Sequence, residues 1–376
     1  MAYTFAPMQS FTSGGRSTSG GGLANDPTYR EQLFDRVAYV NGVETPLLNL
    51  LTREQLYNTL YSFSMGQIAY DRTTIPADVE GKQHTSLGTA NSAKVRIRAY
   101  NGIHIHSRDV AVSDIQRGMR EVGVPDEYQH QAWQETLGLG VDFENIMLWS
   151  RYVAGTESSF PGAPGAAPRT HGLFAWLYDT GYDAVAATIA GTTIPNYYSS
   201  TLYQGSGVDM TRRQFNDNIL QPAWDKGMEL DNAFWFVGTK VKRVISEYSH
   251  IYSGSGATLS ASPLNYRNIP AGAHKIVDKL DIYEGDWGRV FVVKNRNMAN
   301  TTPFAAFGPG GKQNNITPAS CIIGFEPRYV GLGVFEGINH VPLAKLGSTS
   351  QGYVEGVLGL ICRNPRALAG GYDLAA

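Results

Sequence analysis

Three cations alternate with apolar residues in one short stretch of the chain. Lys94, Arg96 and Arg98 would share one face of a strand, with small or branched apolar residues on the other face, because strand side chains alternate between faces. A basic face can be merely solvated, can pair with acidic groups of another subunit, or can contact phosphates. We favour contact with a partner protein, because a complementary surface suits three cations on one exposed strand.

Two histidines, His104 and His106, could together bind a metal from one face of a second strand. No third ligand stands at a recognisable spacing, so we interpret them as polar residues on the wet face of an exposed hairpin. A glycine-rich stretch at 307–313 resembles a phosphate loop, but its first glycine is missing and Gln313 replaces the hydroxyl residue that binds magnesium. The sequence therefore predicts neither a metal site nor a nucleotide cofactor.

The other reactive residue types do not converge on one site either. Cys321 and Cys362 stand far apart in apolar stretches, where thiols are usually inert. Asp281, Glu284 and Asp286 gather beside a tryptophan, but a solvated hairpin tip explains them as well as an acid–base pair does. No catalytic residue is predicted, which is typical of a structural protein rather than an enzyme.

Composition and charge narrow the class of protein further. The 376 residues include 31 basic and 33 acidic side chains, with a net charge of −2, which excludes a globally basic coat for nucleic acid. Two cysteines make no disulfide framework, so we expect reduced thiols in a protein made in a cytoplasm. We find no signal-peptide pattern and no apolar run near the roughly 18 residues of a membrane span.

The N-terminal third mixes irregular and regular segments. We expect a flexible arm rich in glycine and serine over residues 1–25 and a helix over 53–63, where the first residues have capping-box spacing. The basic strand lies in a long two-stranded excursion, about residues 66–108, with 103–107 as its second strand. Such a ribbon is marginal alone in water, so we expect its apolar side to be covered by another copy of the protein.

The longest helical pattern covers residues 126–154 and contains no proline. Such a helix would be about 43 Å long at 1.5 Å per residue, so we expect it to act as a beam. Further elements follow in mixed order and without internal repeats, which indicates an α+β fold. We predict helices at 172–178, 211–227 with a kink at Pro222, and 239–250, and strands at 233–237, 275–283, 289–294, 321–325, 334–343 and 353–362.

Several short stretches of the chain are similar to one known family. They read VETPLLNLL at 43–51, RTHGLFAWL at 169–177, YEGDWGRVFVVKNRNM at 283–298, LAKLGS at 343–348 and NPRA at 364–367. These stretches, and the order of arm, long loop, long helix and compact domain, resemble the major head protein family typified by the SU-ten phage. That family belongs to the tailed-bacteriophage major capsid proteins with the Hong Kong 97-type fold. The resemblance runs from about Val43 to the C-terminus.

The resemblance implies how the chain is divided and what it builds. The implied parts are an N-terminal arm (1–65), an extended E-loop (66–108), a peripheral domain (109–171) with its spine helix (126–154), an axial domain (172–343), and return strands of the peripheral domain (344–376). Copies would assemble as hexamers and pentamers into the icosahedral head that encloses the double-stranded DNA of a tailed phage. Lys94, Arg96 and Arg98 would contact the neighbouring subunit across which the E-loop lies.

The resemblance also implies partners and a location. We expect portal, scaffolding and decoration proteins, and packaged DNA held non-specifically at the inner face, with no membrane and no cofactor. The protein would be assembled in the bacterial host cytoplasm and would reside in the virion. Two alternatives remain: an encapsulin-like compartment shell of the same fold, and a β-rich glycan-binding protein, suggested by the many tyrosines and tryptophans. The long arm and the long E-loop favour the virus.

Overall fold

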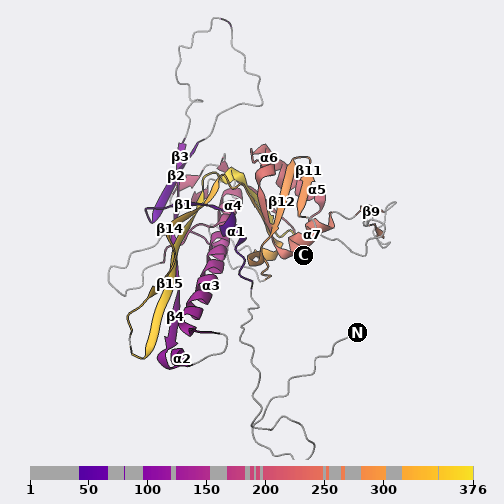
Figure 1. Ribbon diagram of the computed structural model, residues 1–376. Helices are drawn as coiled ribbons and strands as arrows, with labels where there is room; N and C mark the ends of the chain where they lie inside the picture. The colour runs from indigo at the N-terminus through magenta and orange to yellow at the C-terminus, as the bar shows by residue number, and fades with distance from the viewer. Residues whose placement is uncertain are drawn as a thin grey trace, which may run out of the picture. The chain divides into compact units, whose positions relative to one another are not determined.

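The computed structural model describes most of the chain, and Figure 1 shows its helices and strands. The described residues are 42–66, 80, 96–119, 124–152, 167–182, 187–189, 192–194, 198–248, 251–253, 264–266, 281–301, 316–345 and 347–375. The predictions for the arm over 1–25, for Lys94 and for the loop at 307–313 lie outside these residues. Mixed helices and sheets confirm the predicted α+β class.

One of the two larger sheets has four strands in the order β1-β14-β15-β4. Its strands are β1 (Thr52–Gln55), β14 (Val330–Pro342), β15 (Thr349–Cys362) and β4 (His104–Ser113). β15 pairs antiparallel with both β14 and β4, and β1 pairs parallel with β14. The sheet therefore joins strands from the N-terminal third of the chain to strands from its C-terminal end.

The long helix α3 (Glu127–Trp149) packs against this sheet (Figure 1). It begins where predicted, because the carboxylate of Asp126 accepts a hydrogen bond from the Tyr128 amide at 3.0 Å. It ends at Trp149 rather than Ala154, because Ser150 is extended (φ −64°, ψ 145°) and its carbonyl accepts a hydrogen bond from the Gly172 amide at 2.7 Å. The 23-residue helix spans about 35 Å, so it remains a beam.

Packing between α3 and the sheet is close. Leu139, Phe143 and Met147 of the helix are fully buried. On β15, Gly356 faces the helix, and a Cβ atom there would lie 2.9 Å from the ring of Phe143. Glycine at this position therefore lets the helix approach the strand.

The second larger sheet has six strands in the order β11-β12-β8-β13-β16-β7. They are β11 (Ile282–Gly285), β12 (Gly288–Lys294), β8 (Phe234–Val237), β13 (Ile322–Phe325), β16 (Leu368–Tyr372) and β7 (Thr201–Gln204). Every residue of β13 and β16 is buried, as expected for central strands covered on both faces. The predicted hairpin between β11 and β12 is confirmed.

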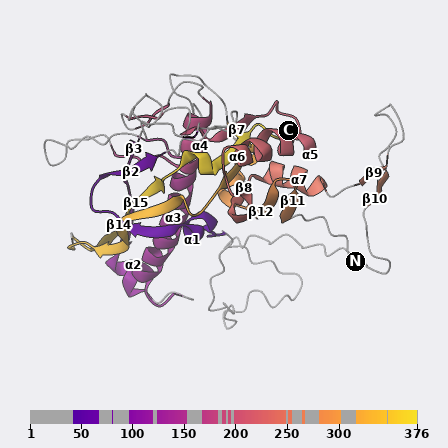
Figure 2. The ribbon, with the colours of Figure 1, turned by 90° about the horizontal axis from the view of Figure 1, so that it is seen from above.

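Helices surround this second sheet in the view from above (Figure 2). They are α4 (Leu173–Tyr182), α5 (Arg212–Phe215), a π-helical turn (Asn216–Leu220), α6 (Gln221–Asp225) and α7 (Thr239–Glu247). The helix predicted over 211–227 is interrupted next to Pro222: a π turn immediately precedes α6, because proline cannot donate the usual amide hydrogen bond to the preceding turn. α7 ends at Glu247, inside its predicted range.

The remaining elements are short. They are α1 (Pro46–Leu50), α2 (Asp114–Gly118), the paired strands β2 (Leu60–Gly66) and β3 (Arg96–Gly102), β5 (Ala187–Ile189) and β6 (Thr192–Ile194), β9 (Ile251–Ser253) and β10 (Leu264–Tyr266), and the 3-10 helices η5 (Leu230–Asn232), η6 (Arg296–Met298), η8 (Pro318–Ser320) and η9 (Pro365–Ala367). Glu144 of α3 anchors α1: its buried carboxylate accepts hydrogen bonds from the amides of Leu47 at 2.8 Å and Leu48 at 2.9 Å.

The helix predicted over 53–63 is wrong. β1 pairs with β14, and β2 pairs with β3, so two strands and the short connection between them, residues 56–59, replace the helix. The residues with capping-box spacing lie in β1, because pairing with the distant strand β14 outweighs their local preference for a helix start. A strand signal was present in β2, where large apolar residues alternate with serines.

The strand predicted over 103–107 is real, but it does not return along the basic strand. β3 continues through Gly102, and β4 then pairs with β15 along its whole length. The partner of the basic strand is β2 instead. Ile103 lies at this change of partner and is buried with Leu56 and Ile361 in a small apolar cluster, which fixes where the chain leaves β3.

Both larger sheets contribute to one hydrophobic core. Val110 and Leu358 from the four-stranded sheet share this core with Phe236 and Phe325 from the six-stranded sheet. The apolar residues of α4 fill the space between them, and Trp176 is fully buried there. A second apolar cluster lies under α5, α6 and α7 on the six-stranded sheet.

Candidate functional site

The basic face predicted from the sequence is present on β3. Arg96 and Arg98 are exposed, while Ile97 and Ala99 point to the opposite, covered face. Residues two apart on a strand lie about 7 Å from each other, so the two guanidinium groups reinforce one local positive charge. Neither arginine forms an ion pair with any residue that the structure describes.

The opposite face of this β2–β3 stem is covered by the chain itself. Met65 and Ala99 are buried in the main core, and the ring of Phe63 lies 5.9 Å from that of Trp176. We expected another copy of the protein to cover the apolar side. For the described stem that prediction is wrong, because α4 and the main core already cover it.

Asn101 fixes the base of the stem. Its buried side-chain amide donates to the carbonyls of Leu360 at 2.7 Å and His171 at 3.1 Å. Its carbonyl oxygen accepts from the amides of Gly102 at 2.9 Å and His171 at 2.8 Å. All the hydrogen-bonding capacity of the side chain is therefore used, and β3 is held rigidly against β15 and the segment before α4.

The four-stranded sheet has one face against α3 and a second face that no described helix covers; we call the second the far face. Asp109, Glu336 and Glu355 lie on it. Strand register places Asp109 opposite Tyr353 and Glu336 opposite Val357, and residues 353, 355 and 357 of β15 share one side. None of the three carboxylates pairs with a cation among the described residues, so the far face is acidic.

A charged cluster clamps β4 to α3 on the near face of the same sheet. Arg108 donates from Nε to Asp142 at 2.7 Å and from a terminal nitrogen to Glu135 at 2.8 Å, and His106 Nε2 lies 3.0 Å from Asp142. Burial disfavours the charged form of Asp142, but these hydrogen bonds outweigh it and hold its pKa below the usual value. Gly138 leaves room for the Arg108 guanidinium, which a Cβ atom would approach to 2.7 Å.

The two histidines of β4 therefore differ from the prediction. They face α3 rather than the wet side of a hairpin, because β4 belongs to the four-stranded sheet. His104 is half-buried, and its pKa is lowered to about 4 by burial and by nearby His106 and Arg169. Within the described parts of the chain, no group of three histidine, cysteine or acidic side chains could hold a metal ion.

The other reactive residue types that the sequence singled out are buried or form ion pairs in the described fold. Cys321 and Cys362 are buried and free, and burial raises the pKa of Cys362 to about 12, so its thiol stays protonated. At the β11–β12 hairpin, Asp281 lies 3.2 Å from the amine of Lys242, and Glu284 lies 2.6 Å from the guanidinium of Arg289. These carboxylates form ion pairs at the hairpin.

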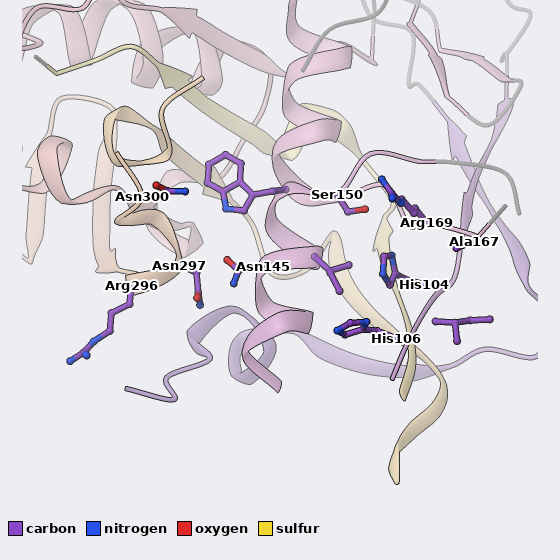
Figure 3. A pocket seen from close by; sticks show the side chains of 12 residues that line it. His104, His106, Asn145, Ser150, Ala167, Arg169, Arg296, Asn297 and Asn300 are labelled. Carbon is purple, nitrogen blue, oxygen red and sulfur yellow. The ribbon is translucent and has the colours of Figure 1, made fainter. Parts of the chain in front are cut away.

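A pocket of about 870 Å³ crosses α3 near its C-terminal end; we call it the α3 pocket. Figure 3 shows Asn297 and Asn300 on the η6 side of the helix, and His104, His106 and Arg169 on the β4 side. The lining residues are His104, Ile105, His106, Asn145, Ile146, Trp149, Ser150, Ala167, Arg169, Arg296, Asn297 and Asn300. Sequence reasoning missed this pocket, because its walls come from four separate segments.

A comparison of the sequence with models of known protein families finds a match over nearly the whole chain. The chain matches the family model described as SU10 major capsid protein over residues 8–375. No curated protein matches it. No helix among the described residues is long and apolar enough to cross a membrane.

Several solved capsid structures have similar folds. A chain of the cyanophage A-1(L) capsid is 13% identical with a TM-score of 0.57, covering 93% of this chain and 98% of that one. A chain of the native GTA particle capsid is 11% identical with a TM-score of 0.55, covering 93% and 96%. A chain of Mycobacterium phage Che8 is 12% identical with a TM-score of 0.50, covering 94% and 99%.

These likenesses show the fold, which is the Hong Kong 97-type fold of phage capsid proteins. The family match covers nearly the whole chain and adds the function, that of a major capsid protein of a tailed bacteriophage. It favours this function over the encapsulin-like and glycan-binding alternatives. The chain belongs to the SU10 major capsid protein family.

Proposed function

We propose that the basic face of β3 is a contact between neighbouring subunits of the capsid. Arg96 and Arg98 carry the proposal, because both are exposed on a stem whose other face is fixed to the chain's own core. Because the backbone of the stem is held, ordering at this contact is limited to the side chains that a complementary surface covers. Lys94 would extend the same face by one further position along the strand.

We propose that the far face of the four-stranded sheet receives this basic strand from the next subunit. Diagonal neighbours on paired strands lie about 7–8 Å apart, so Glu355 repels both Asp109 and Glu336 within a Debye length. A strand carrying cations about 7 Å apart matches that spacing. Covering the acidic face with the basic strand removes repulsion from both surfaces.

Such a contact joins two different surfaces and is therefore heterologous. Repeated around an axis it closes into a ring, and we propose that hexamers and pentamers arise in this way and tile an icosahedral head. Each exposed ion pair contributes only about 0–1 kcal/mol, but a shell multiplies the contact over many copies. The axial domain (172–343) would surround the ring centre, and the contact would join the E-loop of one subunit to the four-stranded sheet of the next.

The further partners of this proposal follow from the family. Portal, scaffolding and decoration proteins would bind the assembled shell, and double-stranded DNA would be packaged against its inner face. A net charge of −2 suits weak, non-specific contact with that DNA. Assembly would take place in the bacterial host cytoplasm, and the protein would have a structural rather than a catalytic role.

Charge reversal tests the proposed contact. In the double variant Arg96→Glu, Arg98→Glu, both surfaces of the contact become acidic, and we expect loss of particles by negative-stain microscopy and light scattering. The matched control, Arg96→Lys with Arg98→Lys, keeps the charge and should assemble. Particles formed by the glutamate variant in wild-type yield would refute the role of the basic face.

A charge swap tests the receiving surface separately. Adding Asp109→Lys and Glu355→Lys to the glutamate variant restores opposite charges across the contact, and we expect particles to return. If circular dichroism shows the combined variant folded but no particles form, the far face is not the receiving surface.

A further inference from the structure

Two tryptophans form an exposed aromatic surface at one end of the six-stranded sheet. Trp224 of α6 is 49% exposed, and the centroid of its ring lies 5.2 Å from that of Trp287 in the turn between β11 and β12. The ring of Trp287 is partly buried and packs on the second apolar cluster, so it supports the ring of Trp224. Exposed tryptophans held in this way are typical of the residues that dominate contacts between proteins.

Carboxylates lie beside this tryptophan pair. Those that are exposed and pair with no cation among the described residues are Asp225, Asp231 and Asp286. The nearby cations are engaged: the guanidinium of Arg289 lies 2.6 Å from Glu284, and the amine of Lys226 donates to a backbone carbonyl. This end of the sheet, with its two tryptophans and three aspartates, is called the acidic end below.

The opposite end of the same strands carries lysines. β12 begins directly after Trp287 and ends at the exposed Lys294, which is in register with Val237 of β8. β8 ends at Val237, and α7 begins at Thr239. Lys240, in the first turn of α7, therefore lies at the same end of the sheet as Lys294. We call these two lysines the basic end.

The basic end keeps its positive charge in the described fold. Neither of its lysines pairs with a carboxylate in the part of the chain that the structure describes. The acids nearby are engaged with other cations: Asp281 lies 3.2 Å from the amine of Lys242, and Glu44 lies 3.6 Å from the guanidinium of Arg296. The two ends of β8 and β12 therefore differ in the sign of their charge.

The two ends cannot meet within one chain. β12 runs from Gly288 to Lys294, which separates its ends by about 20 Å at 3.3 Å per residue. Between two copies, however, the acidic end of one can face the basic end of the other. Their charges are complementary, and a lysine ammonium can also lie over the face of a tryptophan.

We propose that the acidic end of one subunit contacts the basic end of the next around a ring of copies of this chain. The inference rests on the proposed function, because it places the six-stranded sheet at the ring contacts. A capsid subunit assembles with further copies of itself, which makes a second copy the partner. The contact joins two different surfaces, so it repeats in one direction and can close into a ring. It is separate from the contact made by the basic face of β3.

Cysteine cross-linking tests whether the two ends meet. Asp286→Cys places a thiol at the acidic end, and Thr239→Cys places one beside Lys240 with almost no change in shape. The native Cys321 and Cys362 are buried, so they leave the background low. A short bifunctional thiol reagent is added to particles of the double variant, and the linked chains are separated on a denaturing gel. The two single variants are the matched controls.

We expect the double variant to give a ladder of linked chains that extends to whole pentamers and hexamers, because the contact repeats in one direction. Each single variant should give no ladder. Particles of the double variant that give no ladder would overturn the contact and leave the proposed capsid function intact. A wild-type chain that forms no particles would overturn the proposed function and this contact with it.

Trp224→Ser tests the same contact without introduced thiols, and it decides the case if the double cysteine variant does not assemble. Loss of the exposed ring should raise the protein concentration needed for particles at least tenfold, as measured by light scattering. Trp133→Ser is the matched control, because Trp133 on α3 is also 49% exposed but lies outside both ends; it should assemble like the wild type.

Melting temperatures show whether the two serine variants remain folded. A folded Trp224→Ser variant that assembles at the wild-type concentration would contradict the contact, and so would an equal loss of assembly in both variants. If Trp224→Ser does not fold, the cross-linked ladder is the deciding measurement.

Discussion

Replacing Glu144 by glutamine tests how the first described segment of the chain is held on α3. The Glu144 carboxylate is fully buried. One of its oxygens accepts hydrogen bonds from the Leu47 amide at 2.8 Å and from Nδ2 of Asn295 at 2.8 Å, and the other accepts from the Leu48 amide at 2.9 Å. Three donors thus converge on one side chain, and none of them can reach water.

Glutamine keeps the shape but replaces one oxygen with an amide group that donates. One of the three hydrogen bonds is then lost, and a donor faces a donor. A hydrogen bond to a charged acceptor contributes about 1.5–3 kcal/mol, so we expect Glu144→Gln to lower the free energy of unfolding by about 2–3 kcal/mol. Glu144→Ala leaves all three donors unsatisfied and should cost about 5 kcal/mol.

Urea denaturation of the unassembled chain, followed by tryptophan fluorescence, measures the loss. Amide hydrogen exchange at Leu47 and Leu48 measures whether the loss is local to α1. Glu247→Gln is the control. This carboxylate is partly exposed, and its ion pair with Arg243 is long, at 3.9 Å. The substitution should therefore change the free energy of unfolding by less than about 0.5 kcal/mol. A glutamine variant at 144 as stable as the wild type, with both amides still protected, would refute the reasoning.

Three further predictions follow from buried groups. The pKa of His171 is lowered to about 3, mainly by burial. Below about pH 6.5 the unfolded chain therefore binds a proton that the folded chain does not, and stability should fall as pH drops from about 6.5 to 3. His171→Gln should reduce this dependence of the melting temperature on pH. Gly324→Ala would place a Cβ atom 2.5 Å from the ring of Trp235, and we expect a loss of about 1–3 kcal/mol in urea denaturation; a variant of unchanged stability would show that the ring can move freely. Cys321 and Cys362 are buried, with raised thiol pKa values, and should react with a thiol reagent only after denaturation; rapid labelling of the native chain would contradict this.

Local patterns in the sequence predicted the elements that depend on neighbouring residues. The alternation around Arg96 and Arg98 predicted the exposed face of β3, the proline-free helical pattern from residue 126 predicted the start of α3, and Pro222 predicted the break in its helix. Each of these signals acts within a few residues of the feature that it specifies.

The errors came from contacts between residues far apart in the chain. β4 pairs with a strand some 240 residues later, and no local pattern distinguishes that partner from the adjacent basic strand. The same pairing turned His104 and His106 toward α3 and so gave them roles that their spacing did not indicate. Glu144 is similar, since only the folded chain brings its three donors together.

The α3 pocket could not be found from the sequence for the same reason. Its residues come from β4, the end of α3, the segment before α4, and η6. Arg169 lies within a stretch that matches the family, but its position on the pocket wall depends on how the chain leaves α3 at Ser150. A bend at this one residue sets which side chains face one another.

Electron microscopy and light scattering of the purified full-length chain test most directly whether this protein builds a shell. Closed particles, or rings of five and six copies that form them, are expected, with disruption by the Arg96→Glu, Arg98→Glu variant. A folded chain that stays strictly monomeric at every concentration and salt condition tested would contradict the assignment as a capsid subunit.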